Sequence, residues 1–123
     1  MNKAQALQAF WSSFTWNAYD ENTVPRDAEL PYITYESATD SLGNTLSLNA
    51  SLWTRDTGWG TIEAKSAEIA KAIAENGFYR AQIDNGYMVI WKGSPFSRRM
   101  DEPEDDLIRR ILLNIQVEFL TAY

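Results

Sequence analysis

The last part of the chain alternates in hydrophobicity, and this alternation limits the possible folds more than any other feature. Within Leu107–Leu120, the residues Ile111, Leu113, Ile115, Val117 and Phe119 alternate with Leu112, Asn114, Gln116 and Glu118. Successive side chains of a strand point to opposite faces of a sheet, so a period of two predicts a strand with one buried face. The segment Thr45–Arg55 alternates in the same way. We therefore expect a sheet that packs on a core with one face and meets solvent or a partner with the other.

The remaining elements follow from local patterns. Asn2–Phe14 repeats its apolar residues at helical spacing, and an Ala-rich helix is expected at about Thr61–Asn76, with Gly77 ending it. Three further segments are rich in β-branched and aromatic residues or flank a turn, and we expect strands there: Tyr32–Thr39, Tyr79–Ile83 and Tyr87–Trp91. The Asn85-Gly86 pair favours a type I′ hairpin turn between the last two.

Two long segments, 16–30 and 93–106, are polar or contain proline and predict surface loops. Residues 1–123 contain no linker, so they form one domain. The fold class is α+β, with a mostly antiparallel sheet of about five strands and two helices packed on one face.

Composition excludes several classes of function. The chain has no cysteine and no histidine, which removes thiol nucleophiles and the commonest general base and transition-metal ligand. Its net charge of −6 disfavours nucleic acid as a primary partner. Its apolar runs are far shorter than a membrane helix needs, and it begins without a signal-peptide pattern. We expect a protein that is not an enzyme, needs no cofactor or metal and has no membrane partner.

One acidic cluster could in principle hold a cation. It comprises Asp101, Glu102, Glu104, Asp105 and Asp106. Runs of like charge usually stay hydrated, and this spacing fits no EF-hand, so a solvated loop is favoured over a metal site. Arginines flank the cluster, namely Arg98, Arg99, Arg109 and Arg110. Opposite charges of this kind could pair between subunits.

Aromatic residues are abundant, with five Trp, six Tyr and five Phe. Some fall in expected loops, at strand ends or opposite the apolar stripe: Trp16, Tyr19, Trp53, Trp59, Phe96 and Tyr123. Such rings are enriched in protein interfaces, although core packing or anchoring of a loop explains any single one equally well. Stacking on single-stranded nucleic acid would require a cationic groove, which this charge balance does not favour.

The sequence also resembles a family. The residues that carry the likeness are Ala6–Phe14, Ala18–Pro25, Pro31–Glu36, Ser51–Trp53, Gly93–Phe96, Arg99-Met100, Asp105-Asp106 and Ile108–Leu120. In this order they are similar to small tail-terminator proteins of tailed bacteriophages; the likeness spans nearly the whole chain and is weaker over 75–84.

The resemblance implies an α+β protomer of a sixfold ring at the head-proximal end of the tail tube. Such a ring stops tube polymerisation and presents a docking surface for neck proteins. Its partners would be further copies, the tube protein, head-completion proteins and, in a contractile tail, the sheath protein; DNA would pass through without specific binding. We expect a virion protein assembled in the host cytoplasm, and expect segments 16–30 and 94–106 to make ring or tube contacts. The alternatives are a head-tail connector or stopper and, from another class, a small-molecule-binding domain.

Overall fold

The computed structural model describes residues 1–38, 45–102 and 105–121, which form two helices and six strands. In chain order these are α1 (Lys3–Ser12), β1 (Asn17–Asp20), β2 (Tyr32–Tyr35), β3 (Leu46–Arg55), α2 (Gly60–Ala74), β4 (Tyr79–Ile83), β5 (Gly86–Met100) and β6 (Ile108–Thr121). A capping box begins α1, because the Asn2 side chain accepts from the Gln5 backbone N–H while the Gln5 side chain accepts from that of Asn2.

The strands form a single sheet in the order β1-β2-β3-β6-β5-β4. Only the β1–β2 pair is parallel; the other four described pairs are antiparallel. The closing strand β6 lies at the centre, between β3 and β5, and both neighbours are paired with it along most of its length. The α+β class and the mostly antiparallel sheet are therefore confirmed.

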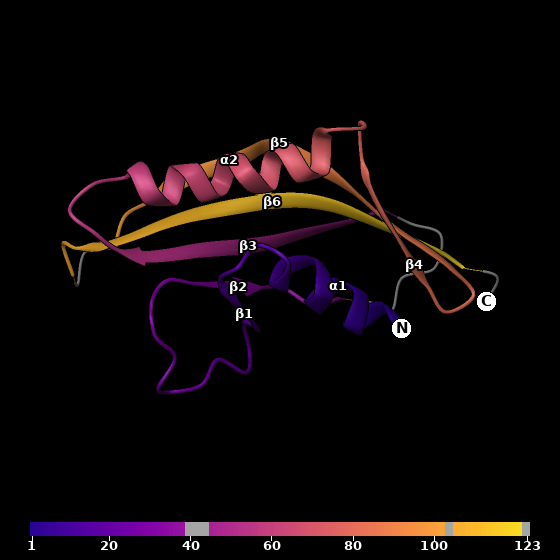
Figure 1. The fold of residues 1–123 in the computed structure, drawn as a ribbon, viewed down its shortest axis with the longest axis horizontal. Coiled ribbons are helices and arrows are strands. Elements are labelled where there is room, and N and C mark those ends of the chain that lie inside the picture. The colour runs from indigo at the N-terminus through magenta and orange to yellow at the C-terminus, as the bar shows by residue number, and fades with distance from the viewer. Residues whose placement is uncertain (39–44, 103–104, 122–123) are drawn as a thin grey trace.

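Both helices pack on one face of this sheet, which we call the inner face. In Figure 1, α2 runs along β5 and β6, while α1 lies beside the shorter strands β1 and β2. The alternation in β6 is confirmed: the residues at odd positions from Ile111 to Phe119 are buried in the core. The helices contribute Leu7, Phe10, Trp11, Ile62, Ile69 and Ile73 to the same core.

A buried lysine ties α2 to the turn that follows α1. The side chain of Lys65 in α2 is only 10% exposed, and its Nζ donates to the Phe14 carbonyl at 2.7 Å. The same Nζ lies 3.3 Å from Thr15 Oγ1, 3.0 Å from Glu68 Oε1 and 5.3 Å from the centre of the Trp16 ring. Thr15 has φ of 69°, which a β-branched residue rarely adopts. Lys65 therefore holds in place a turn whose backbone is strained.

The structure corrects the expected loop at 16–30, because Asn17–Asp20 forms β1, a sixth strand beside β2. A strand of four residues is too short for a recognisable period, and its pairing with residues 32–35 is a long-range event that no local pattern encodes. The expected strand Tyr32–Thr39 ends at Tyr35, and Thr39 lies outside the described residues.

The expected loop at 93–106 is also wrong over its first half, because β5 continues to Met100. Its pairing with β6 jumps from Lys92↔Ile115 to Ser97↔Leu113, so residues 93–96 form a bulge. Pro95 suggested a loop, but a bulge tolerates proline because its residues do not have to donate backbone hydrogen bonds to the neighbouring strand.

The hairpin between β4 and β5 is tight as expected, but its turn is not type I′. The two residues between the strands are Asp84 and Asn85, and only Asn85 has positive φ, at 64°. Type I′ requires positive φ at both central positions. The second helix ends at Ala74 with Glu75 as its C-cap, slightly before the expected end at about Asn76, and Gly77, at φ 87°, follows it and donates its N–H to the Ala74 carbonyl.

Candidate protein interface on the open sheet face

The face of the sheet opposite the helices, which we call the outer face, carries no layer of described structure. Its residues are the ones that alternate with the core series, and in β6 they include Leu112, Asn114, Gln116 and Glu118. None of these four is buried. Three groups of side chains on this face can contact a partner.

The first group is a row of rings and one guanidinium that crosses four strands. The Tyr19 and Tyr32 rings lie 5.8 Å apart, and Tyr32 and Trp53 lie 6.4 Å apart. The guanidinium of Arg110 lies over the Trp53 ring, with Cζ 4.7 Å from its centre. Trp53 Nε1 donates to Thr34 Oγ1 at 3.0 Å, which fixes the orientation of the indole. The row is thus half-exposed and held rigid by its own contacts.

Arg110 is held from two further sides. Its Nε donates to Ser51 Oγ at 3.1 Å, and its Nη1 lies 3.5 Å from Glu102 Oε1. These contacts keep the guanidinium against the indole. Arg110 therefore serves the row chiefly by stiffening it.

The second group is an apolar patch at the far end of the sheet, formed by Phe78, Tyr87, Trp91 and Leu120. Phe78, Tyr87 and Leu120 are 43%, 42% and 48% exposed, although aromatic and aliphatic side chains of this size usually avoid water. Tyr87 lies directly opposite Leu120, the Phe78 and Trp91 rings are 6.5 Å apart, and Arg80 lies over the Tyr87 ring at 4.9 Å. The patch is suited to hydrophobic contact with another protein.

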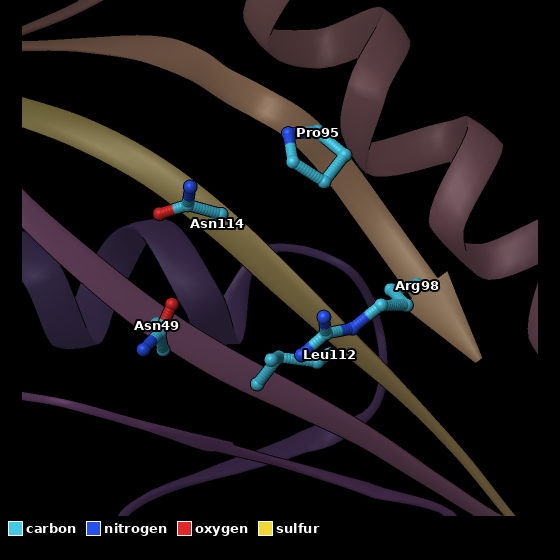
Figure 2. Close-up of a pocket in the computed structure, with 5 residues that line it drawn as sticks. All are labelled: Asn49, Pro95, Arg98, Leu112 and Asn114. Atoms are coloured by element: carbon cyan, nitrogen blue, oxygen red, sulfur yellow. The ribbon is translucent and has the colours of Figure 1, made fainter. Parts of the chain in front are cut away.

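The third group surrounds a hollow that the bulge in β5 opens on the outer face. Figure 2 shows its lining: Asn49 from β3, Leu112 and Asn114 from β6, and Pro95 and Arg98 from β5. The hollow has a volume of about 250 Å³ and is open to solvent. A shallow opening of this kind suits a side chain of a partner better than a buried metabolite.

The structure divides the aromatic residues singled out from the sequence. Tyr19 and Trp53 lie on the outer face, whereas Trp16, Trp59 and Phe96 are only partly exposed and pack against the core. Tyr123 lies outside the described residues. The sequence analysis did not single out Phe78, Tyr87 or Leu120. Leu120 could have been found, because it occupies an even position of the alternating closing strand and so lies on the face opposite the core.

The flanking arginines mostly make contacts within the chain. Arg99 and Arg109 both lie against the Trp59 ring, with their Cζ atoms 4.6 Å and 5.4 Å from its centre. Arg99 Nε donates to Glu63 Oε1 at 2.9 Å, and Arg109 donates to the carbonyls of Thr57 and Asp106. Arg109 Nε is buried and has no partner among the described atoms.

The acidic cluster is not one site. Asp105 pairs with Arg55 and accepts a hydrogen bond from the backbone N–H of Leu107. The hydrogen bond from Leu107, and to a smaller extent Arg55, lowers the pKa of the Asp105 carboxyl below its usual value. Asp101, Glu102 and Asp106 line a separate hollow beside Trp59, and Glu104 lies outside the described residues. Within the described part of the chain, three or more acidic groups nowhere converge as a metal ion would require.

The chain shows a weak structural similarity to a virion protein. A chain in the virion of a native gene transfer agent particle superimposes with a TM-score of 0.48 at 19% identity, over 92% of this chain and 83% of that one. No protein-family model and no curated protein matches the sequence. No helix in the described ranges is long and apolar enough to cross a membrane.

Proposed function

We propose that this protein is a structural component of a phage-type virion. In this proposal it forms a ring, of six copies, at the head-proximal end of the tail tube. The ring ends tube polymerisation and gives neck proteins a surface on which to dock. The proposal takes its specific form from the likeness to tail-terminator proteins along nearly the whole sequence.

One structural observation supports an assembly role directly. A sheet with helices on one face only leaves its other face open, and this face carries a rigid aromatic row and an exposed apolar patch. Rigid aromatic side chains contribute contact area at low cost in conformational entropy, and they are enriched where binding energy concentrates. A closed ring repeats one interface between two different patches, and the three groups on the outer face provide such patches.

Electron microscopy of tail tubes assembled with and without the purified protein tests the proposal. We expect sixfold caps at one end of each tube, and overlong, uncapped tubes when the protein is left out. Tubes of unchanged length that never carry the protein would exclude the role. Density on the head side of the neck, away from the tube end, would instead identify a connector or stopper.

A further inference from the structure

The hollow at the β5 bulge has the chemistry of a site for a carboxylate. Its polar side chains come from three strands: Asn49 from β3, Asn114 from β6 and Arg98 from β5 (Figure 2). None of the three side chains makes a hydrogen bond or ion pair with another described residue; Asn49 and Arg98 are exposed and Asn114 is half-buried, so all three can contact a ligand. Figure 2 shows the Arg98 guanidinium extending over Leu112 toward the strand that carries Asn49.

The backbone around the hollow is built to hold Asn114 in place. A Cβ added to Gly93 would lie 2.6 Å from Asn114 Cγ and 2.8 Å from its carbonyl oxygen, so only glycine allows this approach. Residues 93–96 then bulge away from β6 and leave the hollow beside Asn114. Bulges often re-aim side chains at functional sites, and here the bulge leaves three donors around one opening.

The hydrogen-bond donors around the hollow favour a carboxylate as the ligand. A guanidinium binds a carboxylate with two parallel N–H groups, and each asparagine amide can add a further N–H. The floor and wall of the hollow, Leu112 and Pro95, are apolar, so the carbon atoms of an acidic side chain can pack against them. A cationic ligand would meet Arg98 unfavourably, so the site fits an acidic side chain of a protein.

The chain itself carries suitable acidic groups. The segment between β1 and β2 projects from the body of the molecule (Figure 1) and contains the exposed residues Asp27 and Glu29. Neither carboxylate takes part in the five ion pairs that the described residues make. In this segment Arg26 is the nearest cation in sequence, so the loop tip keeps an unneutralised negative charge.

We infer that the hollow formed by Arg98, Asn49 and Asn114 binds an acidic side chain, Asp27 or Glu29, from the β1–β2 loop of a second copy of this chain. The inference deepens the proposed ring and rests on it. The contact joins two different surfaces of the protomer, so it is heterologous and can repeat around a ring. Opposite charges on the two surfaces would also fix the register between subunits.

The experiment measures self-association by sedimentation velocity, without tail tubes, up to the highest soluble concentration. Arg98→Glu should raise the dissociation constant of the oligomer about tenfold or more, because like charges then meet at the contact. Asp27→Lys with Glu29→Lys should weaken association to a similar degree. Combining these changes with Arg98→Glu should restore much of it, since the charges are then exchanged.

Lys71→Glu is the matched control, since Lys71 is an exposed cation on α2, which packs on the opposite face of the sheet from the hollow (Figure 1). It makes the same change in net charge and should leave association within about twofold. Chemical shifts of the Asn49 and Asn114 side-chain amides should change with protein concentration in the unmodified chain and not in the Arg98→Glu variant.

Three results would overturn the inference: a chain that stays monomeric throughout, self-association unaffected by Arg98→Glu, or no recovery in the exchanged variant. None of them decides the proposed function, which the capping of tubes tests separately. Loss of tube capping in Arg98→Glu with normal self-association would assign the hollow to an acidic group of the tube protein and refute the second copy as occupant.

Discussion

Replacing Lys65 by methionine should destabilise the protein substantially, although lysine rarely stabilises a core. Its ammonium donates to the buried Phe14 carbonyl, and a hydrogen bond from a charged group contributes about 1.5 to 3 kcal/mol. The contact with the Trp16 ring adds about 0.5 to 1 kcal/mol. The pair with Glu68 adds little, because the Glu68 side chain is 50% exposed. Methionine keeps the packing of the stem and avoids burying a charge, which offsets part of the loss.

The net cost for Lys65→Met should be about 2 to 3 kcal/mol, which lowers the melting temperature by about 10 °C for a domain of this size. Urea unfolding followed by tryptophan fluorescence measures the free energy, and thermal unfolding followed by circular dichroism measures the midpoint. Lys71→Met is the control, because Lys71 is exposed on the same helix; its cost should stay below about 0.5 kcal/mol. If the two variants unfold with the same free energy, Lys65 does not hold the α1–β1 turn, and our account of Thr15 fails with it.

Two further predictions concern backbone packing and acid stability. A Cβ at Gly86 would lie 1.8 Å from the Leu120 carbonyl oxygen, so Gly86→Ala should lower the free energy of unfolding by about 3 kcal/mol or more. A Cβ at Gly58 would have nothing within 4 Å, so Gly58→Ala should change it by less than about 0.5 kcal/mol. The same urea titration measures both. The folded-state pKa of Asp105 is lowered, so its contribution to stability is present above the unfolded value, about 3.9, and is lost as the pH falls through the folded value. Asp105→Asn should therefore reduce the loss of stability below about pH 4, and an unchanged pH dependence would contradict that assignment.

The outer-face site shows how far a sequence can lead. Trp53 was predictable, because it occupies a polar-side position of an alternating strand and so must lie on the open face. Arg98 was singled out only for its charge, and nothing local indicated that it would meet Asn49 and Asn114. Those residues are distant in sequence, and their meeting depends on the register of β3, β6 and β5. Lys65 left a weaker signal, since it lies on the same helical stripe as Ile62 and Ile69.

The sequence by itself determined the elements with a clear period: the alternating strands β3 and β6, both helices, and which face of each is buried. Periodicity is a local property, because the backbone geometry of a strand or helix decides where each side chain points. Tertiary structure alone decided that Asn17–Asp20 pairs with β2, that β5 continues past a bulge at Pro95, and that three polar side chains meet at one hollow. These outcomes depend on free energy shared between distant segments, where the pairing of β6 with its neighbours outweighs the weak local preferences of short or polar stretches.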